Sequence, residues 1–270
     1  MHLIDTHVHS LFSRDSKTTV DLAVQAGIQA GLGGIAFTDH TDFSVDPDHP
    51  DDIFDIAQHQ AQIAEAGHKY ASQIQCYCGI EIGLQIEMAE RINAVTSAHQ
   101  FDIIIASLHW IYRQDPYRGA YYEGKTLKES YGGYLECLYQ AAHFFQDYDV
   151  LGHYDYISRY SPYPQKSLRY RDFPDHLDSL LRLLITRGKC LELNTGTLRS
   201  RNGQDAPQFD AHLYTRYREL GGEIISLGSD AHEQARVGAD FPYYAALLKQ
   251  TGFKYLCHYK NRKPIFTLIP

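Results

Sequence analysis

The sequence lacks any apolar run long enough to cross a membrane. A membrane-spanning helix needs roughly 20 consecutive apolar residues, and no segment of the 270-residue chain approaches that length. The opening residues, MHLIDTHVHS, also lack the basic and then apolar pattern of a secretory signal. We therefore expect a cytoplasmic protein.

An excess of basic residues is also missing. The chain has 25 Lys and Arg against 33 Asp and Glu, a formal net charge of −8. Nucleic acids and anionic membranes are bound through basic patches, so this charge argues against both as partners. We expect a small-molecule partner. If that molecule is anionic, bound metal or a few placed arginines must supply the positive charge.

Cysteines are few, and several reactive motifs are absent. The five cysteines are odd in number and scattered, mostly in apolar stretches, as expected for reduced core thiols (Cys76, Cys78, Cys137, Cys190 and Cys257). The pair at 76 and 78 lacks the two-residue gap of a zinc knuckle. There is no Gly-x-Gly-x-x-Gly turn after the first apolar run and no Gly-x-Ser-x-Gly elbow. These absences argue against a dinucleotide-binding fold and a serine nucleophile.

Short apolar runs alternate with longer helical patterns along the chain. The predicted strands are HLIDTH, GGIAFTDH, IQCYCGIEIG, DIIIASLHW, DVLGHYDYI, KCLELNTG and EIISLGSDAH. The predicted helices span 19–30, 52–70, 87–99, 126–145, 173–187, 210–220 and 242–250. A further strand pair is expected within 253–270.

This repeated order predicts a parallel sheet covered by helices. Seven β-α units over about 250 residues favour an α/β fold, a distorted seven-stranded (β/α)7 barrel like a TIM barrel but one unit short. An open doubly wound sheet is the alternative. The length admits one large domain or two small ones, and the continuous pattern favours a single barrel domain over 1–270.

Histidines and carboxylates recur where the predicted strands end. The pair His7-Val-His9 is weak alone, because 15 histidines in this chain produce roughly one such pair by chance. The strand-end set is His7, His9, His40, Glu81, His109, His153, Asp230 and His232. A parallel barrel brings these ends to one face. The alternative, that each is a hydrogen-bonded residue without a special role, is acceptable for any one of them but not for the whole set.

Imidazole and carboxylate without thiolate suit zinc, manganese or iron. The set is too large for one ion and predicts two or three, with Glu81 able to bridge a pair and Asp15 able to serve a third. The remaining histidines fall in or near helical patterns or at uninformative positions, and we interpret them as surface residues without chemistry (His2, His49, His59, His68, His99, His143, His176, His212 and His258).

The ordered motifs DTHVHS, TDH, GIEIG, ASLHW, GHYD, ELNTG and GSDAH resemble the polymerase and histidinol phosphatase superfamily over nearly the whole chain. The ELNT-x-x-LR stretch favours its histidinol-phosphatase branch. The resemblance implies a distorted seven-stranded barrel with three metal ions. The implied ligands are His7, His9, Glu81 and Asp230 for the first; Glu81, His109 and His153 for the second; and Asp15, His40 and His232 for the third. Some family members have histidine where Asp15 stands.

The resemblance also implies that Arg159 and Arg199 bind phosphate, for which a forked guanidinium is well shaped. We also predict that Asn194, in the ELNTG motif, binds substrate. We expect metal-dependent phosphomonoester hydrolysis, in which a metal-bridging hydroxide attacks phosphorus. Asp230 or His232 would protonate the leaving alkoxide.

The resemblance implies L-histidinol phosphate as the substrate. Its amine and imidazole would meet acidic and aromatic residues of the segment after His109, for which the candidates are Asp115, Tyr117, Tyr121, Tyr122 and Glu123. A related phosphoesterase acting on a nucleotide or sugar phosphate is the main alternative. A nuclease would need a basic track, which the net charge disfavours. A non-catalytic metal-binding barrel is the alternative from a different class.

Overall fold

The computed structural model describes residues 2–45, 49–201, 203 and 205–270. Helices and strands alternate along the chain as predicted. The strands are β1 Ile4–Val8, β2 Gly34–Phe37, β3 His40–Thr41, β4 Gln75–Gly83, β5 Ile103–Ser107, β6 Val150–Leu151, β7 Cys190–Asn194, β8 Ile225–Gly228, β9 Tyr255–Lys260 and β10 Lys263–Leu268. The helices are α1 Val20–Gln29, α2 Ile56–Lys69, α3 Ala89–Ala98, α4 Leu127–Phe144, α5 Pro174–Arg187, α6 Ala211–Glu219 and α7 Phe241–Gln250.

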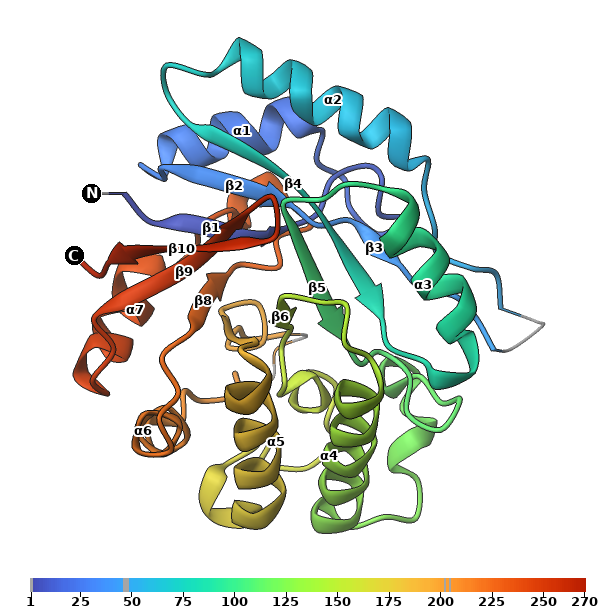
Figure 1. The fold of residues 1–270 in the computed structure, drawn as a ribbon. Coiled ribbons are helices and arrows are strands. Elements are labelled where there is room, and N and C mark those ends of the chain that lie inside the picture. Colours follow the sequence, from blue (N-terminus) through green and yellow to red (C-terminus); the bar gives the residue numbers. More distant parts are fainter. Residues whose placement is uncertain (1, 46–48, 202, 204) are drawn as a thin grey trace.

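The parallel strands pair in the order β1-β2-β4-β5-β6-β7-β8, and the short β3 also pairs with β4. β2 and β3 are two pieces of one predicted strand, interrupted at residues 38–39. The two ends of the sheet approach each other, because Asp230 donates its N–H to the His7 carbonyl and His9 donates to the Ala231 carbonyl, at 2.8 and 2.9 Å. The result is a nearly closed barrel of seven parallel strands with helices on its outside (Figure 1), which confirms the predicted fold class.

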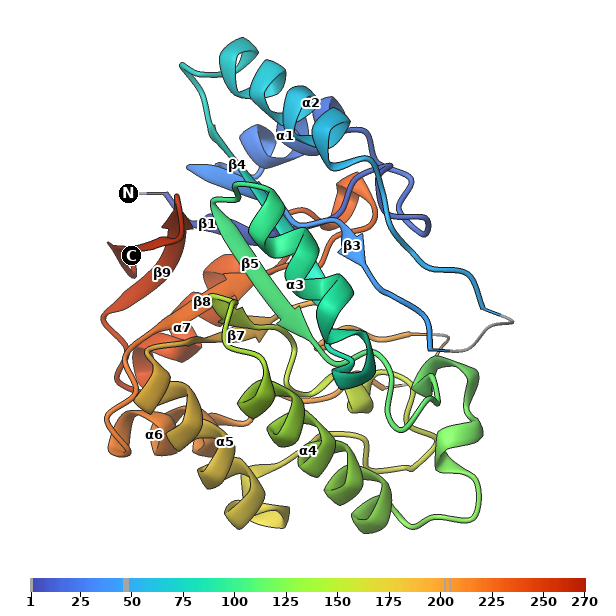
Figure 2. The same cartoon turned by 45° about the vertical axis from the view of Figure 1, so that its right-hand side comes forward.

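Local capping explains where helices begin. The Thr19 side chain accepts the Leu22 N–H at the start of α1, and Thr126 and Glu129 form a reciprocal capping box at the start of α4. The prediction for α2 began too early, at residue 52. The Asp55 side chain caps that helix instead. Figure 2 shows α4 and α5 running side by side, a contact that covers one side of the barrel.

The barrel interior is apolar at the amino ends of its strands and polar at their carboxyl ends. Because alternate strand residues face the same side, Cys190 lies in the apolar interior cluster while Glu192, two residues later on β7, makes polar contacts. The apolar cluster also includes Ile105 of β5 and Cys257 and Tyr259 of β9. The β9–β10 hairpin therefore helps to cover the apolar end and leaves the polar end open for a site.

The predicted strand pair at 253–270 is this antiparallel hairpin. Its two-residue turn, Asn261 and Arg262, has φ values of 50° and 63°, as a tight hairpin turn requires. Arg262 fixes the turn to the barrel through Nε to Asp149 at 2.5 Å and Nη2 to Asp147 at 2.9 Å. All five cysteines are free thiols, as predicted; Cys190 and Cys257 are buried and the other three half-buried.

Candidate metal centre

The nine predicted ligands meet at the carboxyl end of the barrel, where a cavity of about 570 Å³ opens. Its lining includes Asp15, His40, His109, His153, Asp230 and His232. The remaining three, His7, His9 and Glu81, are fully buried and contact these lining residues. The structure thus brings all nine side chains together. Their role as ligands stays a prediction.

His7 and His9, at the end of β1, point their Nε2 atoms at each other across 3.1 Å. Their Nδ1 atoms are occupied, by Glu192 Oε1 at 2.7 Å for His7 and by Ser13 Oγ at 2.9 Å for His9. The Ser13 hydroxyl donates to Asp39, so it accepts from His9. Burial, helped by His232 and His40, lowers the pKa of His9 to about 3. His9 is therefore a neutral ring with its Nε2 lone pair facing inward.

This geometry fits a bound cation. With the ring protons on the Nδ1 atoms, two Nε2 lone pairs face each other across 3.1 Å, and this arrangement requires a proton or a metal ion between them. Burial opposes the charged form of His7, yet the Glu192 and Glu81 carboxylates raise its pKa well above the usual value. Buried carboxylates thus demand positive charge at this point. Orientation of each imidazole by a hydrogen bond at the other nitrogen is also how histidine ligands of metals are held.

Glu81 of β4 lies between the two sides of the cluster. Its Oε1 is 2.8 Å from His153 Nε2 and 3.4 Å from His109 Nε2. Its Oε2 is 2.7 Å from His40 Nδ1 and 3.6 Å from His9 Nε2. Burial disfavours the ionised carboxyl, but the surrounding imidazoles keep its pKa well below the usual range. A carboxylate with one oxygen facing each side can bridge two metal ions.

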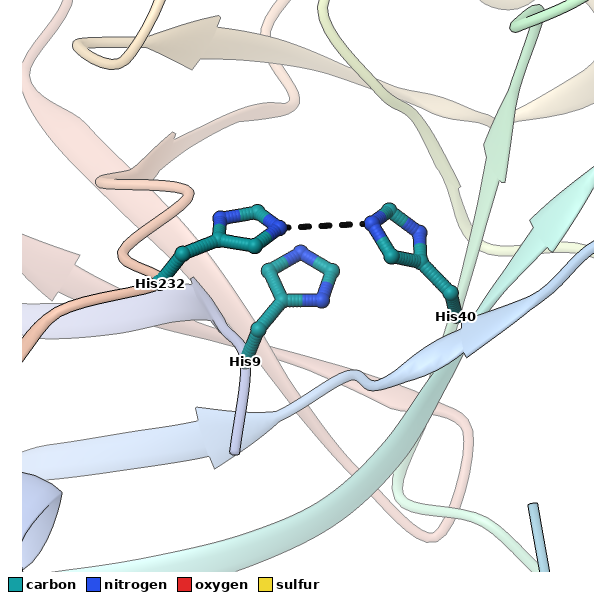
Figure 3. A group of neighbouring side chains, drawn as sticks. All are labelled: His9, His40 and His232. Atoms are coloured by element: carbon teal, nitrogen blue, oxygen red, sulfur yellow. Dashed lines mark hydrogen bonds between the residues drawn. The ribbon is translucent and has the colours of Figure 1, made fainter. Parts of the chain in front are cut away.

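A third group consists of His9, His40 and His232, which come from three different strand ends (Figure 3). The Nε2 atoms of His40 and His232 lie 3.3 Å apart, and the His9 ring packs against both with centroid distances of 4.2 and 4.1 Å. Asp15 Oδ2 lies 3.3 Å from His232 Nε2. The Asp15 side chain is 62% exposed, so it approaches this group from the solvent side.

Four sets of side chains have donor atoms close enough to hold one ion each. They are His9, His40 and His232; His7, His9 and Asp230; His7, Glu81 and His153; and His40, Asp42 and His109. These sets share members, so they describe alternatives for a few ions. They overlap the predicted partition, and they add one residue that the prediction omitted, Asp42.

Asp230 adopts a backbone conformation that is unusual for a residue with a side chain, with φ of 52°. Its Oδ1 lies 3.1 Å from His9 Nε2 and its Oδ2 lies 2.5 Å from Arg159 Nη2. Burial opposes the Asp230 carboxylate, but Arg159 and His7 hold its pKa well below the usual range. Strained backbone of this kind is concentrated at functional sites, and here it aims one carboxylate at both a candidate ligand and an arginine.

The two predicted phosphate-binding arginines both line the cavity. Arg159 is 8% exposed and donates from Nη2 to Asn194 Oδ1 at 3.0 Å and from Nε to Thr197 Oγ1 at 2.9 Å. Arg199 donates to the Ser229 carbonyl. Asn194 is 3% exposed and lies behind Arg159 rather than on the cavity wall. Asn194 is therefore placed to orient Arg159, and its position does not favour the predicted direct contact with substrate.

Sequence reasoning missed two carboxylates that orient candidate ligands. Glu192 of β7 is fully buried; it binds His7 through Oε1, and its Oε2 accepts the His153 N–H at 2.7 Å. Asp42 accepts from His109 Nδ1 at 3.0 Å. For Glu192 the sequence offered a clue to this role, because it is an ionisable residue in the middle of a buried apolar strand. Asp42 follows the TDH motif by two residues and carried no comparable clue.

Several predictions for the segment after His109 were wrong. Tyr121 and Tyr122 are 2% and 4% exposed and bond backbone carbonyls of Ser130 and Ile157, so their rings belong to the core. Glu123 is exposed and lies outside the cavity lining. Asp115 and Tyr117 do line the cavity, where Asp115 accepts the Tyr117 N–H at 2.8 Å.

Two histidines predicted to lie at the surface are buried instead. His59 of α2 is 0% exposed and lies with Nε2 3.0 Å from Asp39 Oδ2. Asp39 also accepts from the backbone and hydroxyl groups of Ser10 and Ser13. His59 thus helps to fix the loop that follows His9. His258 of β9 is 7% exposed and packs against Tyr77.

The fold and the cavity together define a class, the parallel β/α barrels that gather metal-ligating imidazoles and carboxylates at the carboxyl ends of their strands. The sequence pattern of the PHP domain matches residues 5–196. The chain belongs to the PHP domain family.

Similar proteins cover nearly the whole chain. A probable histidinol-phosphatase of Clostridium acetobutylicum is 31% identical over 239 residues, 88% of this chain and 90% of the relative. A histidinol-phosphatase of Lactococcus lactis subsp. lactis is 31% identical over 264 residues, 97% and 96% of the two chains. The crystal structure of histidinol phosphate phosphatase from Lactococcus lactis subsp. lactis, complexed with zinc, L-histidinol and phosphate, matches with a TM-score of 0.90 at 30% identity and covers 98% of this chain and 99% of that one.

In the described part of the chain, no helix is both long and apolar enough to span a membrane.

Proposed function

We propose that this chain is a metal-dependent phosphomonoesterase that hydrolyses L-histidinol phosphate, acting as one domain over residues 1–270. The observation that carries this proposal is the placement of Arg159 and Arg199 beside a buried cluster of imidazoles and carboxylates in one cavity. Arginine forks bind phosphate and the cluster suits divalent metal. The Lactococcus lactis structure, with histidinol and phosphate in its complex, supports this substrate.

The metal requirement is two or three divalent ions, zinc, manganese or iron, held by His7, His9, Asp15, His40, Glu81, His109, His153, Asp230 and His232. Zinc in the related complex supports the first of these metals. Bound divalent ions supply Lewis-acid stabilisation of the phosphoryl group and a water of lowered pKa.

Arg159 and Arg199 bind and orient the phosphate group. Arg159 is already fixed by Asn194, Thr197 and Asp230 before any ligand arrives. Such preorganised donors stabilise charge that develops on phosphoryl oxygens without further rearrangement. Burial lowers the pKa of Arg199 to about 10, which leaves its guanidinium charged at neutral pH.

Of the two candidates to protonate the leaving oxygen, His232 is better placed in a site with two bound ions. Its Nδ1 lies 3.1 Å from the Asp230 carbonyl, so its Nε2 either binds a third ion or carries the proton. The pKa of Asp230 is held well below its usual range, so this carboxyl has no proton to give at neutral pH. The His232 ring is 25% exposed and lines the cavity. Asp230 instead holds Arg159 and contributes to metal binding.

The cavity also suits the cationic end of histidinol phosphate. Asp42, Asp52, Asp115 and Tyr117 line it. Carboxylates and aromatic rings are the groups that bind an ammonium or a protonated imidazole. One cavity therefore combines arginines for the phosphate with acidic and aromatic groups for the remainder of the substrate.

The test is phosphate release from L-histidinol phosphate, nucleotides, phosphotyrosine and sugar phosphates, using protein whose bound metal has been counted. A strong preference for L-histidinol phosphate supports the proposal. Efficient hydrolysis of another ester in its place would keep the chemistry and reject this substrate. Bound metal without hydrolysis of any ester would indicate a non-catalytic metal-binding barrel.

A further inference from the structure

Three arginines on the cavity wall are held by one turn, residues 194–197, which begins at the end of β7. Arg159 donates to Asn194 Oδ1 (3.0 Å), Arg199 Nε to the Thr195 carbonyl (3.4 Å) and Arg201 Nη2 to the Gly196 carbonyl (2.7 Å). Each of three consecutive residues therefore accepts from a different guanidinium. Acceptors on adjacent residues keep the three cationic groups close together.

The turn leaves little freedom to these groups. A Cβ atom built on Gly196 would lie 2.8 Å from Asn194 Oδ1, closer than Cβ atoms approach other atoms in proteins, and 3.0 Å from Arg199 Nη2, which is tighter than nearly all such contacts. Glycine is thus the residue that allows Asn194 and Arg199 to pack against this backbone. The guanidinium groups are consequently fixed relative to one another.

The three arginines carry more positive charge than their surroundings balance. Asp230 forms an ion pair with Arg159. Among the residues that the structure describes, no carboxylate lies within ion-pair distance of Arg199 or Arg201. Burial, together with neighbouring cationic groups such as Arg159, lowers the pKa of both side chains. Asp230 also attracts Arg199 and Arg201 electrostatically, but one carboxylate does not balance three guanidinium groups, and such an excess of positive charge favours binding of an anion.

Arg201 also has unused hydrogen-bonding capacity. Its side chain is half-buried and lines the cavity with Arg159 and Arg199. The Nε atom of Arg201 is buried and, within the described part of the chain, has no hydrogen-bond partner. A buried donor without an acceptor is costly, so the protein does not by itself satisfy the hydrogen-bonding capacity of this guanidinium.

We propose that Arg201 is a third anion-binding arginine of this cavity and contacts the same phosphate group as Arg159 and Arg199. This rests on the proposed function for the identity of the ester. It needs only a phosphate anion to be tested, so inorganic phosphate is the probe.

The single tryptophan of the chain, Trp110, lines the same cavity and provides a fluorescence signal. We would titrate inorganic phosphate into the metal-loaded protein and follow Trp110 emission, with calorimetry as a second readout. Arg201→Gln should raise the Kd about tenfold, since a charge-assisted hydrogen bond is lost. The Kd of Arg201→Lys should lie between those of the unsubstituted protein and Arg201→Gln, because lysine keeps the charge and loses the forked guanidinium.

Glutamine is shorter than arginine and does not reach the Gly196 carbonyl, so the melting temperature is needed to separate an effect on the turn from an effect on anion binding. Arg171→Gln is the matched control, because Arg171 is 65% exposed and lies outside the cavity lining. Metal content and melting temperature are compared in all variants. If the glutamine variant folds poorly, the Kd of Arg201→Lys decides the outcome. A Kd within twofold of the unsubstituted protein in both Arg201 variants overturns the proposal, as does failure of the unsubstituted protein to bind phosphate. The two proposals can also fail separately. If the unsubstituted protein does not hydrolyse L-histidinol phosphate but binds phosphate, and Arg201→Gln loses that binding, the role of Arg201 is supported and the substrate is rejected.

Discussion

Glu192 holds two candidate ligands through one carboxylate. Its Oε1 binds His7 Nδ1, and its Oε2 accepts the backbone N–H of His153 and the side-chain amide of Asn194. Because Asn194 in turn binds Arg159, Glu192 connects the imidazoles proposed to bind metal with an arginine proposed to bind phosphate. One buried residue that never reaches the cavity thus sets the relative position of both halves of the site.

Glu192→Gln keeps the shape of this side chain and removes its charge. We expect metal affinity to fall about 10–100-fold, since carboxylates that orient histidine ligands typically contribute that much. Competition with a chromogenic chelator measures the affinity directly. Glu223→Gln, at a side chain that is 73% exposed, is the control; equal affinity in the two variants would contradict the role given to Glu192.

Strand-end residues of the site could be predicted from the sequence because parallel strands bring their carboxyl ends together regardless of chain separation. The burial of His59 could not be predicted, because it depends on the packing of α2 over Asp39, and this tertiary contact leaves no local pattern in the sequence. The predicted substrate contacts of Tyr121 and Tyr122 were wrong for a similar reason. A turn-rich sequence predicts a surface loop, but in this segment the two tyrosine side chains fold back into the core.

At the scale of elements, strands and helices were predicted well because apolar periodicity and capping residues are local properties. The starting point of α2 was not, because Asp52 and Asp55 are both plausible caps and only the Asp42–Asp52 backbone pairing removes the first. The interruption between β2 and β3 was also missed. Asp39 lies in that break, where it collects donors from the loop after β1.

β4 places two thiols, Cys76 and Cys78, in half-buried positions where burial raises their pKa values to about 11 and about 12. The thiolate is the nucleophile, so a raised pKa leaves a smaller reactive fraction at pH 8. We expect alkylation by iodoacetamide to be at least about 100-fold slower than for an unperturbed thiol of pKa about 8.5. The rate should still rise with pH through pH 10.

Peptide mass spectrometry after alkylation across this pH range would measure both thiols separately. The same protein in denaturant is the control, because unfolding removes the burial that shifts the pKa. A folded-state rate that levels off near pH 9 would be incompatible with the raised values.

For the molecule as a whole, metal binding should contribute to stability as well as to activity. Chelation should abolish phosphate release and lower the melting temperature by more than about 5 °C, because loss of a ligand held at 100 times its Kd costs about 2.7 kcal/mol. Differential scanning calorimetry before and after chelation, then after zinc is restored, tests this. His9→Ala should respond less to chelation. Full activity in protein shown to be free of metal would reject the metal assignment.

The junction that closes the barrel also completes the site, since His7 and His9 are joined by backbone hydrogen bonds to Asp230 and Ala231. These partners lie near opposite ends of the chain. At synthesis rates of about 5–20 residues per second, roughly 10–45 seconds separate the appearance of His7 from that of Asp230 on the ribosome. During that interval the nascent chain lacks Asp230 and His232, so the proposed set of nine ligands is complete only at the last stage of synthesis.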